Sequence, residues 1–275
     1  NEICPQEQDY NDALAVSKKL DIKLYRVDFS KEYWDLVFKH FLSEYQKGRT
    51  PNPDILCNKY IKFDHFLNFS KKFNVDYVAT GHYAKIRKLE NEVILSKAKD
   101  ENKDQSYFLS ALTQKQLENI LFPLGDLTKE EVREIANKLD LDVANKKDST
   151  GICFIGKRNF REFLKNYIPA KKGNIVDRKT NKKIGEHNGV FYYTIGQRKG
   201  LGIGGLKNFE NHKWFVVEKD VVKEILYVSG EKESKYIYAN RCIVKNFNWI
   251  GKEQEKNIEM DLKAKFRYRQ NYVRV

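Results

Sequence analysis

The sequence predicts an α/β protein whose first part is built on a parallel sheet and whose later part is rich in β-strands. Two observations lead to this prediction. Up to about residue 158, helical patterns alternate with strand patterns, the order typical of a parallel sheet with helical crossovers. Beyond it, short strand patterns are separated by Gly, Asn and charged turns. We expect three domains, at 1–158, 159–229 and 230–275.

The first five expected elements of the first domain follow one another along the chain. Residues 9–20 and 31–46 have helical periodicity, and residues 22–29 between them alternate like a strand. A third helix is expected to run from Pro53 to about residue 73, and a buried strand from residue 75 to Gly81 follows it.

A later helix has the clearest boundary signal. Thr128 is expected to cap it, and Glu131 to complete a capping box. Helical spacing places four apolar residues on one face of this helix: Val132, Ile135, Ala136 and Leu139.

The β-rich part is expected to form hairpins or small barrels, with strands in 173–187, 189–196, 213–220 and 224–230. Residues 258–269 alternate apolar and charged side chains, which predicts one more strand. Its polar face would carry Lys263, Lys265, Arg267 and Arg269. A row of four basic side chains suits binding to the phosphate backbone of a nucleic acid. The alternative interpretation is an ordinary charged face exposed to solvent.

Basic residues outnumber acidic residues by 51 to 38, giving a formal net charge of +13. This excess indicates either a polyanionic partner, nucleic acid above all, or a well-solvated surface. No apolar run approaches the ~20 residues of a membrane span, and no signal peptide opens the chain. The four cysteines form no C-x-x-C pair, so no metal site is expected, and in a cytosolic protein they stay reduced.

The segment PNPDILCN, residues 51–58, places a thiol just behind a helix start. Asn52 is expected to cap the helix and Pro53 to be its first residue. Asp54 and Cys57 then share a face near the positive end of the helix dipole, which favours a thiolate. The alternative is a buried structural cysteine. The buried stripe is expected to comprise Leu56, Tyr60, Phe63 and Leu67.

A second thiol, Cys153, lies between Ile152 and Phe154 in the segment KKDSTGICFIGKR. Its apolar neighbours indicate a buried filler residue, whereas the flanking lysines and arginine indicate an electropositive approach. Residue patterns alone therefore leave open a thiol enzyme with an anionic substrate.

Six segments, in order over nearly the whole chain, read GRTPNPDILCNKYIKF, ATGHY, KDQSYFL, KKDSTGICFIG, GEHNGVFYYTIGQRKGLGIGG and FRYRQ. Together they resemble the tRNA-specific 2-thiouridylase family (MnmA/TrmU). The resemblance implies a nucleotide-hydrolase-like domain of the PP-loop ATPase type, a central β-rich domain and part of a C-terminal β-barrel. It also implies a cytoplasmic enzyme that uses ATP with Mg²⁺ to thiolate C2 of the wobble uridine in tRNAs for Lys, Glu and Gln.

The resemblance also implies roles for individual residues. Cys153 matches the cysteine that carries a persulfide, received from a sulfur-relay protein or a cysteine desulfurase, and Cys57 matches the nucleophile that attacks it, releasing sulfide or closing a disulfide. Asp54 matches a general acid/base, and the segment from Asn52 through Pro53 to Asp54 matches the part that meets the target base. Gly81 matches an ATP contact. The implied tRNA contacts are His82, Lys103, Asp104, Gln105, Arg267 and Tyr268.

The sequence departs from the family pattern at both ends. Family members begin with a strand and an S-G-G-x-D-S loop that grips pyrophosphate, and the chain is expected to start beyond it and to stop within the barrel. We therefore expect the 275 residues alone to thiolate tRNA poorly. A non-catalytic tRNA-binding fragment is one alternative, and a basic nucleic-acid-binding module with structural cysteines is another.

Overall fold

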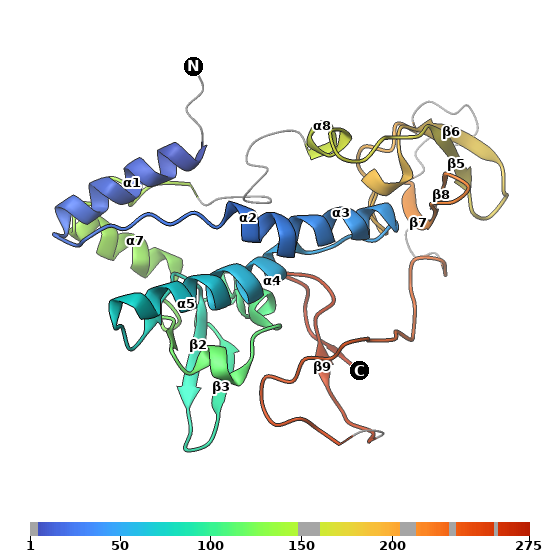
Figure 1. Cartoon of the computed structure of the whole chain (residues 1–275). Helices are drawn as coiled ribbons and strands as arrows, with labels where there is room; N and C mark the ends of the chain where they lie inside the picture. The colour runs from blue at the N-terminus through green and yellow to red at the C-terminus, as the bar shows by residue number, and fades with distance from the viewer. Residues whose placement is uncertain (1–4, 148–159, 204–212, 231–234, 256–257) are drawn as a thin grey trace. The chain divides into compact units, whose positions relative to one another are not determined.

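The computed structural model describes residues 5–147, 160–203, 213–230, 235–255 and 258–275 (Figure 1). The chain divides into two compact units. The first comprises 1–34, 54–156 and 247–275, and the second comprises 35–53 and 157–246. Among the described residues, no helix combines the length and the apolar character that a membrane span requires.

The three helices expected in the first part of the chain are confirmed. Residues 9–20 lie largely in α1, Pro5–Lys19. Residues 31–46 lie in a continuous run made of α2 (Ser30–Tyr33), the π-helix η1 (Trp34–Phe38) and α3 (Lys39–Gln46). The third helix is a run of four segments: α4 (Pro53–Leu56), the π-helix η2 (Cys57–His65), α5 (Phe66–Ser70) and the 3₁₀-helix η3 (Lys71–Phe73).

The prediction of a strand at 22–29 is wrong. No regular strand occurs there, and Ile22 and Tyr25 are 61% and 59% exposed. A segment with alternating apolar and polar residues forms a strand only where a neighbouring strand supplies backbone hydrogen bonds. No described strand pairs with this segment.

The expected parallel pairing is present, over a short length. β1, Val78–Ala79, pairs in parallel with β4, Ile120–Leu121. The strand expected from residue 75 to Gly81 is therefore only two residues long. Beside it, β2 (Ala84–Lys88) and β3 (Val93–Lys97) form an antiparallel hairpin. The short helices η4 (Ser106–Leu109) and α6 (Gln114–Leu117) connect β3 to β4.

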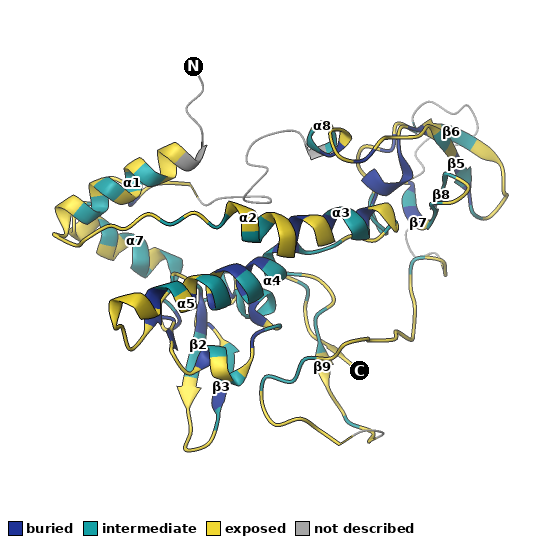
Figure 2. Ribbon diagram, in the orientation of Figure 1, coloured by how far each residue is buried: buried dark blue, intermediate teal, exposed yellow. Residues whose placement is uncertain are grey.

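The core of the first unit lies between the third helix and the β2–β3 hairpin. Figure 2 shows buried residues gathered where these elements face each other. Apolar burial of this kind is the main stabilising term in folding. The buried cluster comprises Phe63, Ala84, Val93, Leu109, Leu112, Leu117, Ile120 and Phe122.

The capping box at Thr128 is confirmed. Thr128 Oγ1 accepts from the Glu131 backbone N–H at 3.2 Å, and the Glu131 carboxylate accepts from the Thr128 backbone N–H at 2.6 Å. Helix α7 (Lys129–Lys138) follows. Its apolar residues are not buried: Ile135 is 45% exposed, and Leu139, just after the helix, is 47% exposed.

The second unit contains a four-stranded sheet in the order β6-β5-β8-β7. The strands are β5 (Gly173–Asp177), β6 (Lys183–His187), β7 (Phe215–Asp220) and β8 (Ile225–Ser229). β5 and β8 are parallel, and the other pairs are antiparallel. The described strands do not close into a barrel. This unit also contains the helix α8, Phe160–Lys165.

In the later part, one expected strand is absent and another is much shorter than expected. Residues 189–196 contain the 3₁₀-helix η5 (Val190–Tyr192), whose three residues are all buried, so no inward–outward alternation exists there. In 258–269 only β9 (Lys263–Ala264) is a strand, paired with β10 (Val273–Arg274). The chain turns after Phe266, which separates Arg267 and Arg269 from the strand and breaks the basic stripe.

Candidate functional site

The helix that carries Cys57 begins at Pro53, as the sequence predicts. Proline suits this position because its missing N–H would have no helical partner there. Cys57 is buried, at 8% exposed, and Asp54 is half-buried. The thiol therefore lies at the start of the π-helix η2 and faces the interior of its unit.

The buried face of this helix differs from the expected stripe. Phe63 and Leu67 are buried as expected, whereas Leu56 and Tyr60 are only half-buried. For Tyr60 the π-helix explains the shift, because each of its turns contains more residues than an α-turn and rotates the face that follows. The residues buried in their place are Cys57, Asn58 and Ile61.

A side chain from α6 supports this irregular helix. Phe63 leaves helical geometry, with φ −108° and ψ 15°. The Gln116 side-chain amide donates to the carbonyl oxygens of Lys59 at 2.9 Å and Phe63 at 2.8 Å. Its Oε1 also accepts from the Thr113 backbone N–H at 3.0 Å, which completes the capping box of α6. The pattern Thr-x-x-Gln at 113–116 is the sequence signal for this capping box, which was not among the predicted features.

Asn58 connects the thiol-bearing helix to the KDQSYFL segment. It is 2% exposed, and its Nδ2 donates to the Phe108 carbonyl at 3.0 Å. Its Oδ1 is buried and accepts no hydrogen bond from any described residue. Asn58 follows Cys57 directly in PNPDILCN, so its position was a signal that sequence reasoning missed.

The positive charge of Lys62 affects the pKa of both Asp54 and His82. Burial raises the pKa of Asp54, and the charge of Lys62 partly offsets that effect. Burial, with a smaller effect of Lys62, lowers the pKa of His82 from 6.5 to about 4. His82 is therefore neutral near pH 7, and a protonated Asp54 can donate a proton. Lys62 was not expected from the sequence.

Gly81 and His82 follow the carboxyl end of β1, where ligands bind in parallel α/β sheets. The His82 ring packs against Phe63 and Phe122, with centroids 5.5 and 5.9 Å apart. Its Nδ1 lies 2.8 Å from Thr80 Oγ1. Gly81 is exposed, and a Cβ placed there would make only an ordinary contact, 3.8 Å from Leu124. A ligand can therefore approach this backbone closely.

Asp104 and Gln105 hold the loop that carries them. Asp104 is 5% exposed, and its carboxylate accepts from the Ala98 N–H at 3.1 Å and from Ser106 Oγ at 2.9 Å. Gln105 pairs with the backbone of Tyr83 through two hydrogen bonds, of 2.8 and 2.9 Å. This pairing fixes the residue that follows His82.

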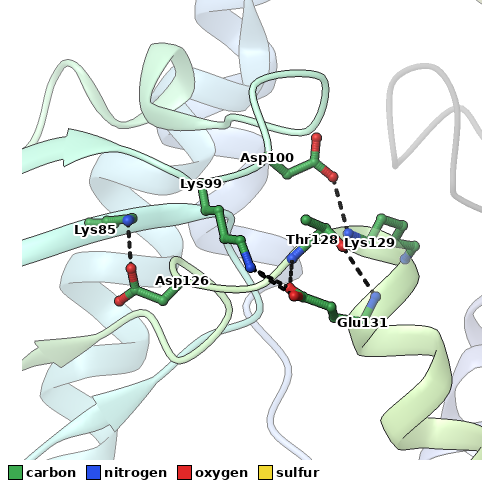
Figure 3. Close-up of polar contacts among 7 residues, drawn as sticks. All are labelled: Lys85, Lys99, Asp100, Asp126, Thr128, Lys129 and Glu131. Atoms are coloured by element: carbon green, nitrogen blue, oxygen red, sulfur yellow. Dashed lines mark hydrogen bonds and ion pairs between the residues drawn. The ribbon is translucent and has the colours of Figure 1, made fainter.

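The same loop is attached to the start of α7. Asp100 accepts from the Lys129 backbone N–H at 3.0 Å, and Lys99 pairs with Glu131 at 2.7 Å (Figure 3). Asp100 also accepts from the Lys103 backbone N–H at 3.3 Å. The position of Lys103 thus depends on the cap of α7.

Arg267 and Tyr268 lie in the turn after β9. The Tyr268 ring packs on Phe108, with centroids 4.6 Å apart, and Tyr107 Oη donates to the Phe266 carbonyl at 3.3 Å. Arg267 is exposed. Because Asn58 donates to the Phe108 carbonyl, three segments far apart in the sequence meet in one unit: residues 54–58 of PNPDILCN, KDQSYFL and FRYRQ.

The second cysteine and a metal-binding group are not among these contacts. Cys153 lies outside the described residues, so no distance relates it to Cys57. Within the part of the chain that the structure describes, no three His, Cys, Asp or Glu side chains form a group that could hold a metal ion.

The chain is similar to two protein-family models and to proteins of known name. Residues 1–157 match the family described as the tRNA methyl transferase HUP domain, and residues 161–230 match the tRNA methyl transferase PRC-barrel domain. The chain is 58% identical over 276 residues to the tRNA-specific 2-thiouridylase MnmA of Mycoplasma mycoides subsp. mycoides SC, covering 98% of this chain and 72% of that protein. The chain belongs to the tRNA-specific 2-thiouridylase family.

A second tRNA-specific 2-thiouridylase, MnmA of Ureaplasma urealyticum serovar 10, is 55% identical over 272 residues, covering 98% of this chain and 70% of that protein. The resemblance drawn from the six segments is confirmed. The expected fold is confirmed as well: a HUP domain of the PP-loop type followed by a PRC-barrel domain.

Proposed function

We propose that this protein is a tRNA sulfurtransferase that replaces the C2 oxygen of the wobble uridine by sulfur, in tRNAs for Lys, Glu and Gln. One observation carries the proposal: the thiol-bearing helix and two segments expected to contact tRNA meet through Asn58, Phe108 and Tyr268. The 58% identity to a tRNA-specific 2-thiouridylase supports the same function.

Asp54 is proposed to act as the general acid/base on the uridine. Its raised pKa increases the protonated fraction near neutral pH, which suits proton donation to a departing oxygen. Pro53 fixes the helix start, so Asn52, Pro53 and Asp54 present a stiff backbone to the base. We assign to His82, neutral because of its burial, a hydrogen bond to the tRNA rather than a charge contact.

Cys57 is proposed as the nucleophile in the sulfur step. Its thiolate attacks Sγ of the persulfide-bearing Cys153, the bond between Sγ and the outer sulfur breaks, and the electron pair of that bond leaves with the outer sulfur, which replaces the activated C2 oxygen as sulfide. A Cys57–Cys153 disulfide results, which must be reduced before the next turnover. The persulfide would come from a sulfur-relay protein or a cysteine desulfurase.

ATP with Mg²⁺, when bound, supplies adenylation of the C2 oxygen and so makes it a leaving group. Gly81 fits a nucleotide contact, because its backbone is exposed at the carboxyl end of β1 and has no side chain to obstruct approach.

The test is 2-thiouridine formation on unmodified tRNA with ATP, Mg²⁺ and a sulfur donor, measured by mass spectrometry of the nucleosides. Whatever 2-thiouridine wild type forms, Cys57→Ser and Cys153→Ser should each abolish it while still binding tRNA. Full thiolation by both variants would contradict the proposal and favour a binding module with structural cysteines.

A further inference from the structure

The stretch YTIGQRKG, residues 193–200, forms a turn that is bonded to β7 of the second unit, and the proposed reaction uses none of its residues. The Gly196 N–H donates to the Val216 carbonyl at 2.8 Å, and the Val216 N–H donates to the Gln197 carbonyl at 3.0 Å. The Gln197 side chain accepts from the Thr194 N–H at 3.0 Å, and the Gln197 N–H donates to the Thr194 carbonyl at 2.9 Å. The backbone of Thr194 is therefore fixed on both sides.

Lys219, on the same strand, supports the start of this turn. Its Nζ donates to the Tyr193 carbonyl at 2.7 Å. Burial lowers the pKa of Lys219 to about 8, which reflects the cost of taking an ammonium group out of water. A half-buried charge is tolerated where it forms hydrogen bonds, so this contact holds the ammonium group and the Tyr193 carbonyl together. The turn thus has a second anchor on β7.

A second stretch of the same unit, residues 48–53, leads from α3 to the start of α4. Gly48 has a positive φ of 75°, and a Cβ at this position would lie 2.6 Å from Val221 Cγ1. Glycine suits this position, because the backbone passes very close to the residue that follows β7. The Arg49 backbone N–H donates to the Glu44 carbonyl, and the Arg49 guanidinium pairs with the Glu44 carboxylate, both at 2.9 Å. These contacts fix the chain as it leaves α3.

The two stretches meet at a pair of threonine side chains. Thr50 Oγ1 donates to Thr194 Oγ1 at 3.3 Å. Thr50 lies two residues before Asn52, a span of at most about 7 Å along the chain. Pro51 and Pro53 each have a fixed φ, so few soft torsions separate Thr50 from Asn52. A displacement of Thr50 is therefore passed on to Asn52 and Pro53.

We propose that Thr194 is a positioning residue of the thiolation reaction, which acts through Thr50 to set the place of residues 52–53 against the target uridine. This inference rests on the proposed function, because that function brings the uridine to these residues. The turn at 193–200 suits the role, because its backbone and a half-buried ammonium group tie it to β7. A misplacement of about 1 Å can slow a reaction by about 100-fold, even when the displaced residue lies far from the reacting atoms.

The test follows the position of the uridine without requiring thiolation. A tRNA that carries 4-thiouridine at the wobble position forms a photo-crosslink with residues next to that base, and peptide mass spectrometry locates the crosslink. Thr194→Val replaces the hydroxyl that accepts from Thr50 by a methyl group, whereas Thr194→Ser keeps the hydroxyl. We expect Thr194→Val to lower the crosslink yield at residues 51–54 about fivefold, and Thr194→Ser to match wild type. The affinity for tRNA should stay within about twofold, because phosphate contacts elsewhere supply most of it.

Thr180→Val is the matched control. Thr180 Oγ1 donates to the Asp177 carboxylate at 2.6 Å, at the turn between β5 and β6 of the same unit, so this variant also loses one hydrogen bond. It should crosslink like wild type. Thr50→Val removes the donor of the Thr50–Thr194 bond from an exposed residue and should reproduce the yield of Thr194→Val. This variant keeps the test decisive if Thr194→Val does not fold.

A lower yield in Thr194→Val and Thr50→Val alone supports the inference. Equal yields from wild type and these variants overturn it, while the proposed function stands. An equal loss in Thr180→Val shows a general effect of stability and overturns it as well. A loss of tRNA affinity as large as the loss of crosslink would make Thr194 a tRNA contact instead of a positioning residue. If wild type binds tRNA but forms no crosslink at residues 51–54, the proposed contact with the base and this inference both fail.

Discussion

The Gln116 side-chain amide donates to the Phe63 carbonyl, 2.8 Å away, at the residue where the Cys57 helix departs from helical geometry. A second bond, to Lys59, makes Gln116 a support for the π-helix one turn beyond the thiol.

Gln116→Glu should therefore loosen this helix. The carboxylate keeps the acceptor of the capping box but loses both donors and faces two carbonyl oxygens. We expect the free energy of unfolding to fall by about 2 kcal/mol. Alkylation of Cys57, followed by peptide mass spectrometry, should become faster. Glu131→Ala removes the α7 capping box as a control and should leave Cys57 alkylation unchanged; equal alkylation in both variants would contradict the role of Gln116.

Asp54→Asn should separate activity from stability. Because burial raises the pKa of Asp54, the ionised carboxylate opposes folding above the unfolded pKa of about 3.9. Removing the charge should leave the unfolding free energy at pH 7 equal to or above that of wild type. Thiolation should fall at least 100-fold. Asp64→Asn, on the same helix, is the matched control for activity. A less stable Asp54→Asn would show that the carboxylate is stabilising.

His82 should titrate near pH 4 in the folded protein, followed by NMR of its ring proton. Its folded pKa lies below the unfolded value of about 6.5, so its contribution to stability is complete above pH 6.5 and is lost as the pH falls toward 4. His82→Gln should remove this part of the pH dependence of unfolding. A midpoint near 6.5 would show that the ring is hydrated.

Gly125→Ala should destabilise the first unit strongly. A Cβ at Gly125 would lie 2.1 Å from the Ala84 carbonyl oxygen, at the start of β2 in the core. We expect a loss of about 3 kcal/mol or more, measured by denaturant unfolding. Gly81→Ala, whose Cβ would meet only Leu124 at 3.8 Å, should unfold like wild type. Equal stability of the two variants would mean that β2 moves aside freely.

The sequence by itself determined the features that neighbouring residues encode. Pro53 starts a helix because its fixed φ suits the first turn, and Thr128 with Glu131 forms a capping box because both partners lie within one turn. The order of helices and most strands of the second unit follows from local periodicity, and the six segments identified the family.

Only the tertiary structure decided which faces are buried and which extended segments become strands. On the Cys57 helix, Cys57 and Asn58 are buried where Leu56 and Tyr60 were expected, and the π-helix and its contacts with Gln116 are features that no local pattern predicts. Residues 22–29 and 258–269 alternate like strands, yet strands need hydrogen-bonding partners from distant parts of the chain, and those partners are set by the fold. The meeting of Asn58, Phe108 and Tyr268 has the same origin, because no local pattern records which distant residues will touch.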